Sequence, residues 1–325
     1  MFLEALEKVL ADTVTSAAIR RIEAGEAPDA VWQPIEEAGF LDLMLPEAQG
    51  GAALPLADLF PILECLGRHG MPLPVAQTIV VRALSGGRVA MPPGMLTLAL
   101  QLQRTAAGAW RCPQVPGGQV AAHVLVADGD ALLLLDCASA AREPVGDRRS
   151  LAADLSWRQA PAALALESGG RDLPAFAAAL MAAQLSGAMQ RCFDMALDQC
   201  NTRVQFGKSI GKFQALQQQL SVMAEHVLAV AIAAEAAFRS DRQAPAALAA
   251  AVAKSRASEA VSVVAATVHA VHGAIGMTDE YDLGLFTRRL HDWRLAYGAE
   301  HAWNLQIGAQ VLDSDRSIAE LVQAV

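Results

Sequence analysis

One change of pattern along the chain constrains the fold more than any other feature. Apolar residues recur at helical spacing up to about residue 86 and again after about residue 167, but between these points they come in short runs separated by turn residues. Helical spacing places apolar side chains on one face, whereas short runs bounded by Gly, Pro and Asp are typical of strands. We therefore expect a mainly α-helical chain with a small β domain in its middle.

The pattern divides the chain into three predicted domains. They are an N-terminal helical domain at 1–86, a small β domain at 87–166 and a C-terminal helical bundle of the four-helix type at 167–325. A chain of 325 residues exceeds what one small core needs, which agrees with several packed units. Aromatic residues make up only 5% and Ala is abundant, which favours close-packed helices over a β-sandwich.

Individual elements follow from the same patterns. In the first domain we expect a helix near the N-terminus, a short helix with Trp32 and Ile35 that ends near Gly39, and a third helix at 56–66. The expected strands are 96–102, 119–127 and 131–136. The expected interhelical loops of the last domain lie at 207–211, 240–245 and 273–278, where glycine, proline or polar residues interrupt the apolar periodicity.

Composition excludes several classes of protein. Apolar residues reach 54% and charged residues only 18%, so the chain is not intrinsically disordered. The net charge of −9 argues against nucleic-acid and anionic-membrane partners. The apolar segment 173–189 is shorter than a comfortable membrane span, and we expect it to be a helix buried on most sides.

The cysteines and the N-terminus indicate a cytoplasmic protein. The five cysteines form no CxxC pair, and Cys192 and Cys200 are expected to pack as small apolar side chains. The N-terminus lacks the cationic region of a signal peptide. The seven histidines show neither HxxxH nor HExxH spacing, so we expect no metal site.

The first candidate site is an interhelical turn with the sequence RVQFGKSIGKFQ, which begins at Arg203. Arginine supplies planar hydrogen-bond donors for phosphate, and glycines allow backbone amides to approach a ligand closely. From these residues alone, an ordinary helix connection with a surface arginine is an equally open interpretation.

The second candidate site is a glycine-rich turn, HGAIGMTDEY, which begins at His272. No predicted strand precedes it, which argues against a dinucleotide-binding βαβ unit. A glycine-rich helix cap is the alternative interpretation of this turn.

Together the two turns resemble the signature of the acyl-CoA dehydrogenase family. The resemblance extends to the N-terminal half, where five short motifs follow in the family's order: Trp32, Gly39-Phe40, Leu45-Pro46-Glu47, Gly50-Gly51 and Glu64-x-x-Gly67-Arg68. It implies the family's fold of a helical N-terminal domain, a β middle domain and a C-terminal four-helix bundle. It also implies FAD, an acyl-CoA substrate, an oligomer and electron-transfer flavoprotein as the redox partner.

The resemblance also implies which residues contact the cofactor. Arg203, Gln205, Phe206 and Gln214 would contact an FAD seated mainly in a neighbouring subunit. The glycine-rich turn, with Gly273 and Gly276, would contact the nucleotide part of an FAD from the other side.

The family's catalytic base is missing from both of its usual places. In most members a Glu stands twenty-one residues after the last glycine of the turn, and that position is Tyr297 here. A phenol is a poor base for an α-proton at neutral pH. Other members carry the Glu on an earlier helix, at about Ala177 here. Glu300 is a weak candidate for a displaced base, with a solvated carboxylate as the alternative.

Further departures concern the flavin and the remaining charged residues. The family's Thr-Glu-Pro loop and its Trp-Thr segment, which face the flavin ring, have no counterpart between residues 91 and 161, and Ala270 and Ala274 replace a Gln and a Gly of the glycine-rich motif. We expect Asp279 and Glu280 to cap the following helix. The remaining cations, Arg288, Arg289 and Arg294, are expected to form a solvated or subunit-facing stripe, with CoA phosphates as a further possibility.

These observations predict a subunit of a flavin-dependent acyl-CoA dehydrogenase, which catalyses α,β-desaturation of an acyl-CoA thioester. The chain would contribute contacts to FAD phosphate within a hetero-oligomer that contains two copies of each chain. Fatty-acid or steroid side-chain degradation is the expected context by family analogy. Three alternatives remain open at this stage: a homo-oligomer with a displaced base, a catalytically silent structural partner, and a flavin monooxygenase on the same fold.

Overall fold

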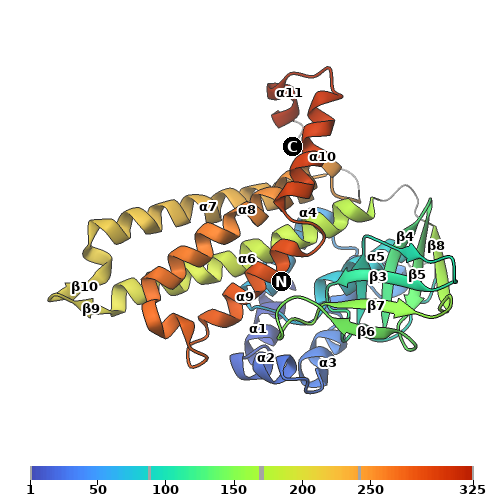
Figure 1. Cartoon of the computed structure of the whole chain (residues 1–325), viewed down its shortest axis with the longest axis horizontal. Coiled ribbons are helices and arrows are strands. Elements are labelled where there is room, and N and C mark those ends of the chain that lie inside the picture. The colour runs from blue at the N-terminus through green and yellow to red at the C-terminus, as the bar shows by residue number, and fades with distance from the viewer. Residues whose placement is uncertain (1, 87–88, 168–171, 241–242, 324–325) are drawn as a thin grey trace.

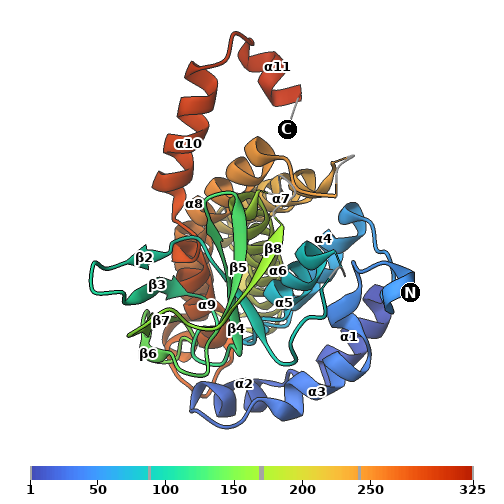
Figure 2. The same cartoon turned by 90° about the vertical axis from the view of Figure 1, so that its right-hand side faces the viewer.

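The computed structural model describes residues 2–86, 89–167, 172–240 and 243–323. Long helices run along the molecule, the strands gather at one end, and the β9–β10 turn lies at the opposite end (Figure 1). Turning the molecule shows the first three helices along one side of the strands (Figure 2). The prediction of a mainly helical chain with a small β part is confirmed, while the three domain boundaries stay a prediction.

The N-terminal part contains five α-helices and two short 3₁₀ segments among the described residues. They are α1 (Phe2–Thr13), α2 (Ser16–Glu23), α3 (Asp29–Glu37), η1 (Phe40–Asp42), η2 (Glu47–Gln49), α4 (Leu56–Arg68) and α5 (Val75–Ser85). The expected helix around Trp32 ends before Gly39, whose φ of +76° fits the left-handed conformation that glycine adopts easily. Helices α2 and α5 had not been resolved by the sequence pattern.

The middle part forms two four-stranded sheets. The strands are β1 (Leu96–Ala99), β2 (Gln103–Arg104), β3 (Trp110–Val115), β4 (His123–Asp128), β5 (Ala131–Asp136), β6 (Ala141–Pro144), β7 (Ala153–Trp157) and β8 (Ala163–Glu167). Their orders are β1-β4-β5-β8 and β2-β3-β7-β6, and β1 pairs with β4 in parallel while the other pairs are antiparallel. Cys112, Val124, Leu135 and Trp157 belong to the small core of this part.

Two strand predictions require correction. The expected strand at 96–102 ends at Ala99, and the strand expected at 119–127 begins only at His123. The apolar run from 119 to 122 is instead a connection held by Arg142, whose guanidinium donates to the carbonyl oxygens of Gly118, Gln119 and Ala121 at 2.7–2.8 Å. A buried connection must satisfy its backbone polar groups without a ladder, and Arg142 does so here.

The C-terminal part is built from long helices around one core. Its elements are α6 (Leu173–Thr202), β9 (Val204–Gln205), β10 (Lys208–Ser209), η3 (Ile210–Lys212), α7 (Gln214–Phe238), α8 (Ala247–His272), η4 (Gly273–Met277), α9 (Leu283–Leu295), α10 (Glu300–Leu312) and α11 (Ile318–Gln323). Figure 1 shows α6, α7 and α8 lengthwise, with α10 and α11 projecting away from the body.

Helices α4 and α6 cross at a pair of glycines. A β-carbon added at Gly67 would lie 2.0 Å from the backbone oxygen of Gln184, and one added at Gly187 would lie 1.9 Å from that of Glu64. No real side chain tolerates such distances, so only glycine permits this approach. Ser186 donates a hydrogen bond of 2.6 Å to the Glu64 carboxylate beside the crossing. The crossing therefore fixes the N-terminal helices against the bundle.

Burial answers the question of the apolar segment 173–189. It forms the first half of α6, where all residues except Pro174 are buried, so the prediction of a buried helix is confirmed. Two other stretches, Gln214–Phe238 and Ala247–Met277, are long and apolar enough to cross a membrane, with 33% and 44% of their apolar windows buried. Core helices of a bundle pass the same test, so this is weak evidence for a span. All five cysteines are buried and unpaired, which confirms that Cys192 and Cys200 pack as apolar side chains.

Candidate functional site

The turn at Arg203 is a tight β-hairpin between α6 and α7. Strand β9 pairs with β10 in antiparallel register, Gln205 opposite Lys208. The two residues between them, Phe206 and Gly207, have φ of +52° and +77°. Two consecutive positive φ values are typical of the hairpin turn that matches the twist of the strands. The Phe206 side chain is consequently directed outwards and is 91% exposed.

Arg203 ends helix α6 and lies directly beside the glycine-rich turn. Its Nη1 donates a hydrogen bond of 3.2 Å to the carbonyl oxygen of His272, and a β-carbon added at Gly273 would lie 4.0 Å from the same nitrogen. The two sequence motifs therefore meet within one chain. Which side of an FAD each turn contacts stays a prediction, and within this chain both turns lie together.

No carboxylate among the described residues pairs with Arg203. In the described part of the chain, Arg149, Arg288 and Arg289 each pair with a carboxylate, whereas Arg203 forms no ion pair. An unpaired guanidinium next to a glycine backbone is a suitable arrangement for an anion such as phosphate.

One glycine of this turn is open to solvent and the other is packed against the bundle. Gly273 has φ of +67°, and no atom other than Arg203 Nη1 approaches its missing side chain within 4 Å. Gly276 faces inwards, since a β-carbon there would lie 2.9 Å from Cβ of His272 and 3.0 Å from Leu283. The buried His272 ring contacts the carbonyl oxygen of Val268 at 2.7 Å and the hydroxyl of Tyr281 at 3.2 Å. Gly273 is thus available to a ligand, and Gly276 serves packing.

Apolar side chains surround this arrangement on the surface. We call the following set the tip surface: Arg203, Val204, Gln205, Phe206, Gln214, Gly273, Ile275 and Met277. Its apolar members are exposed by 39% (Ile275) to 91% (Phe206), and Gln205 and Gln214 are exposed as well. Large exposed apolar side chains around an unpaired cation are typical of a surface that another molecule covers.

Tyr297, the residue expected at the position of the family's base, lies in the turn between α9 and α10 and is buried. Tyr297 has φ of +60° and Gly298 has φ of +97°. The Tyr297 side chain is only 8% exposed, and its hydroxyl lies near Gln77 and Thr97 without a satisfactory hydrogen bond among the described residues. Burial raises the pKa of this phenol far above its usual value. Tyr297 cannot act as a base at neutral pH.

A lysine that the sequence analysis missed holds this turn. Lys254 of α8 is fully buried, and its Nζ donates to Ser258 Oγ at 2.7 Å and to the carbonyl oxygens of Arg294 and Gly298 at 2.8 and 2.9 Å. Burial lowers the pKa of Lys254 to about 7. The sequence signal is slight: Lys254 and Arg256 are the two cations of the otherwise mostly apolar run AAAVAKSRA, and nothing local distinguishes a buried lysine from a solvated one.

Neither of the two alternative residues, Glu300 and Ala177, provides a free base. Glu300 accepts hydrogen bonds from Nε and Nη2 of Arg294, and this pairing lowers the pKa of the carboxyl to about 2. Such a carboxylate is a weak base for a carbon acid. Ala177 is buried on α6 and supplies no titratable group.

The predicted basic stripe and the predicted helix cap both require correction. Arg289 is buried against Glu23 of α2 at 3.0 Å, Arg288 contacts the same carboxylate at 3.4 Å, and neither forms a solvated face. Asp279 does not cap α9 but pairs with Arg149 through two hydrogen bonds of 2.9 and 2.8 Å. These ion pairs connect α2 with α9 and the β6–β7 loop with the segment before α9. Glu23 needs a cation because it is buried, whereas Asp279 remains largely exposed.

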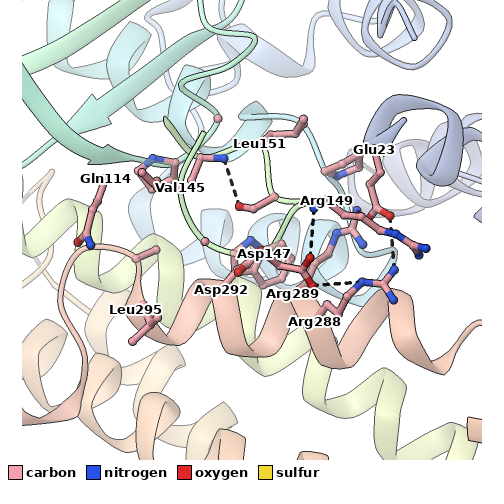
Figure 3. A pocket seen from close by; sticks show the side chains of 18 residues that line it. Glu23, Gln114, Val145, Asp147, Arg149, Leu151, Arg288, Arg289, Asp292 and Leu295 are labelled. Carbon is pink, nitrogen blue, oxygen red and sulfur yellow. Dashed lines mark hydrogen bonds and ion pairs between the residues drawn. The ribbon is translucent and has the colours of Figure 1, made fainter. Parts of the chain in front are cut away.

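A cavity of about 120 Å³ lies between α9 and the β6–β7 loop (Figure 3). Figure 3 shows Asp292 and Leu295 reaching it from α9, with Val145 and Asp147 opposite. Arg149 and Arg288 form its charged end. Sites for drug-sized ligands usually measure about 300–1,000 Å³ and are mainly apolar, so this cavity is too small and too charged at that end to bury a large planar ring.

Two models of protein families match this chain, one at each end. Residues 1–87 match the family described as acyl-CoA dehydrogenase, N-terminal domain, and residues 175–312 match acyl-CoA dehydrogenase, C-terminal domain. The chain is similar to acyl-CoA dehydrogenase IpdE2 of Mycolicibacterium smegmatis, with 34% identity over 83% of each chain.

Two solved structures share the fold. One chain of the ChsE4–ChsE5 complex from Mycobacterium tuberculosis superposes on this protein with a TM-score of 0.84 at 22% identity. The match covers 97% of this chain and 97% of that chain. A variant of the Tcur3481–Tcur3483 steroid ACAD superposes with a TM-score of 0.82 at 26% identity, covering 96% of this chain and 97% of the other. The predicted fold class is confirmed by these neighbours.

Proposed function

The chain belongs to the acyl-CoA dehydrogenase family of oxidoreductases, and from that premise we propose that it is the non-catalytic half of a flavin-dependent, hetero-oligomeric acyl-CoA dehydrogenase. Its role is to hold the phosphate part of an FAD whose ring lies in a homologous partner subunit. The observation that carries this proposal is the contrast between an open, unpaired Arg203 beside Gly273 and a closed Tyr297 at the base position.

The tip surface fits the anionic part of FAD. Arg203 has donors to spare, and Gly273 leaves room for the close approach of a phosphate that a β-carbon would occupy. Phe206 and Gln214 extend the surface beyond these two residues. When bound, FAD supplies the acceptor for the hydride that leaves the β-carbon of the acyl group. Arg203 then neutralises phosphate charge, and the tip surface excludes water from the bound cofactor.

The same chain does not fit the flavin ring. The cavity between α9 and the β6–β7 loop measures about 120 Å³ and carries charged groups such as Arg288 and Asp292. Burying a large, uncharged ring against these groups would remove solvation that the ring only partly replaces. The ring therefore needs a partner, and a homologue that retains both the Glu base and the flavin-facing loops supplies it.

We propose a bulky acyl-CoA as the substrate of the assembled enzyme. The support is the resemblance to a structure described as a steroid ACAD and to IpdE2. A complex of two different chains, ChsE4 and ChsE5, has the same fold as this protein, which is consistent with a hetero-oligomer. Electron-transfer flavoprotein is the expected electron acceptor by family analogy.

The proposal is tested by the flavin content of the complex. Co-expressed with a homologue that retains the Glu, the chain should purify as one yellow complex with one FAD for each unlike pair of chains. Arg203→Ala removes charge-assisted hydrogen bonds worth about 1.5–3 kcal/mol each, so FAD affinity should fall about 10- to 100-fold. The measurement is flavin absorbance against added FAD for the reconstituted complex.

Arg239→Ala is the matched control, because Arg239 is an exposed arginine that pairs with Glu235 on the surface of α7. This control should retain normal FAD affinity. Equal FAD affinity in the Arg203 and Arg239 variants would contradict the role of Arg203. A stable homo-oligomer of this chain with one FAD per subunit, bleached by acyl-CoA, would contradict the whole proposal.

A further inference from the structure

We propose that Tyr297 is a plug that fills the acyl-binding space of this chain, and that Lys254 holds the plug in place. The inference rests on the proposed function, because it explains why this subunit leaves substrate to its partner. It goes further because it names the side chain that fills the space, Tyr297, and the residue that fixes its turn, Lys254. Four observations on the turn between α9 and α10 lead to it.

The first step is the location of the acyl space. A general base must lie within about 2.6–3.2 Å of the group whose proton it removes. By the family resemblance, residue 297 stands where other members carry that base. The space in front of the 297 side chain is therefore the space that an acyl α-carbon would occupy. In this chain that space lies towards Gln77 of α5 and Thr97 of β1, since the Tyr297 hydroxyl reaches both.

The second step is that the space is filled. Tyr297 is 8% exposed, and Gln77 and Thr97 are 5% and 0% exposed. One aromatic side chain thus spans from the bundle to the N-terminal helices and to the first sheet. The Tyr297 side chain therefore occupies the space between these elements.

The third step separates a plug from an ordinary core residue. Among the described residues, neither the Tyr297 hydroxyl nor Oε1 of Gln77 has a hydrogen-bond partner, although both atoms are buried. A buried unsatisfied polar group costs about 1–3 kcal/mol. Packing alone would favour phenylalanine and an apolar neighbour here. Two neighbouring polar atoms without partners fit a position suited to a polar ligand, which the Tyr297 side chain fills instead.

The fourth step is the device that holds the plug. A positive φ at a non-glycine residue costs about 1–3 kcal/mol and persists only where surrounding contacts enforce it. Lys254 donates to the carbonyl oxygens on both sides of Tyr297, those of Arg294 and Gly298. Nε1 of Trp303 donates to the same Gly298 oxygen at 3.2 Å. The turn is therefore fixed from beneath.

Lys254 itself is a positioning residue. An ammonium group has three donors, and Ser258, Arg294 and Gly298 accept all of them. No donor remains for a substrate or a cofactor. Removing Lys254 should therefore release the turn without removing a ligand contact.

The first experiment measures binding of a short probe, hexanoyl-N-acetylcysteamine, which carries the acyl thioester without the nucleotide. Calorimetric titration of the purified complex should show one additional site per copy of this chain in Tyr297→Ala. Tyr297→Phe keeps the ring and should add none. Tyr297→Gly, which removes the side chain and suits the positive φ of this position, serves if the alanine variant does not fold. An unchanged number of sites in the folded variant would overturn the plug.

The count of additional sites is independent of the proposed function. A catalytic partner contributes its own site to the starting value, whereas a homo-oligomer of this chain starts from none. In either assembly the alanine variant should gain one site for each copy of this chain. If the hetero-oligomer hypothesis is wrong, only the number of probe sites in the wild-type assembly changes. If the plug hypothesis is wrong, only the number of sites that Tyr297→Ala adds changes.

The second experiment uses the chain's only two tyrosines, Tyr281 and Tyr297. Nitration by tetranitromethane, mapped by peptide mass spectrometry, should modify Tyr281, which is half-buried, and spare Tyr297. In Lys254→Met, Tyr297 should become nitrated at a rate close to that of Tyr281. Ser258→Ala removes the partner on the same helix and a long hydrogen bond of 3.4 Å to the Arg294 carbonyl oxygen, keeps both Lys254 bonds to the turn, and should leave Tyr297 protected. Protection that survives Lys254→Met in the folded complex would refute the holding role.

Discussion

Two turns of this protein share a pair of positive φ angles but differ in their surroundings. Phe206-Gly207 and Tyr297-Gly298 are both an aromatic residue followed by glycine, with φ of +52° and +77° in the first and +60° and +97° in the second. Yet Phe206 is 91% exposed and Tyr297 is 8% exposed. An aromatic residue in a left-handed conformation is uncommon, so each turn requires a reason for its strain.

The difference lies in where the compensation comes from. At Tyr297 the chain itself compensates, through packing and through donors from Lys254 and Trp303. At Phe206 the short hairpin and an edge-on contact with the Phe213 ring, at 6.1 Å between centroids, support the turn, and the side chain stays almost fully exposed. A strained and exposed aromatic residue is understandable if another molecule covers it. The Tyr297 turn is thus covered within the subunit, whereas the Phe206 turn is exposed and, under the proposed function, is covered by the partner subunit.

The sharpest separation of the two turns is the effect of removing the aromatic ring. Tyr297→Ala should lower the free energy of unfolding by about 3–5 kcal/mol, as large buried aromatics do. Phe206→Ala should change it by less than about 0.5 kcal/mol in the separated subunit, because the side chain is exposed. Urea denaturation at one protein concentration measures both. Similar losses in the two variants would break the comparison.

The second separation uses pH. The pKa of Lys254 is lowered to about 7 by burial, whereas in an unfolded chain a lysine titrates near 10.4. Between these values the unfolded state binds more protons, so the free energy of unfolding should rise with pH. Each unit of pKa difference is worth about 1.4 kcal/mol, which makes a rise of a few kcal/mol the expected order.

Lys254→Met should remove this rise, and Lys212→Met, at an exposed position in η3, should keep it. Urea denaturation of the three proteins at a series of pH values provides the measurement. Identical pH profiles for the Lys254 variant and the wild type would show that Lys254 is not the titrating group.

The glycines of the two turns provide a smaller test. Gly207→Ala has open space around the new methyl group, so only the positive φ opposes it, at about 1–2 kcal/mol. Gly298→Ala meets the same opposition, and its β-carbon would also lie 3.2 Å from Nε1 of Trp303. The loss of unfolding free energy should thus be larger at Gly298. Thermal denaturation can rank the two variants, and a larger loss at Gly207 would be inconsistent with this account.

The smallest expected effect concerns Glu300, which lies just after the closed turn. Its pKa is lowered to about 2 by Arg294, so the pairing stabilises the fold above pH 4.5 and is lost as the pH falls towards 2. Partly exposed ion pairs contribute about 0.2–1 kcal/mol, and Glu300→Gln should cost no more than that at pH 7. Dehydrogenase turnover of the complex should be unchanged. A large loss of turnover would identify Glu300 as the displaced base after all.

Sequence periodicity predicted the long helices but only part of the β structure. Strands β4 and β5 were recognisable as continuous apolar runs. Strand β6 is exposed to half-exposed along its length, and β3 and β8 bury only two and one residues respectively. Such strands form because neighbouring strands supply their hydrogen bonds, and a local pattern does not contain that information.

The site divides in the same way. Arg203 and Gly273 were identified because each lies in a compact local motif. Lys254 was missed because its acceptors are carbonyl oxygens 40 and 44 residues further along the chain. Arg288 was assigned to a solvated face because its partner, Glu23, lies 265 residues earlier. Contacts between distant segments decide whether a charge is solvated, and a local pattern does not reveal them.

The glycine crossing of α4 and α6 also has a consequence for the order of folding. The Ser186–Glu64 hydrogen bond beside it joins residues that are 122 positions apart. Ribosomes add about 5–20 residues per second, so roughly 6–24 s pass between the synthesis of the two halves of this contact. During that time the apolar face of α4, including Leu59 and Leu63, has no α6 to pack against. A newly made N-terminal segment must therefore be kept from aggregating until the first bundle helix arrives.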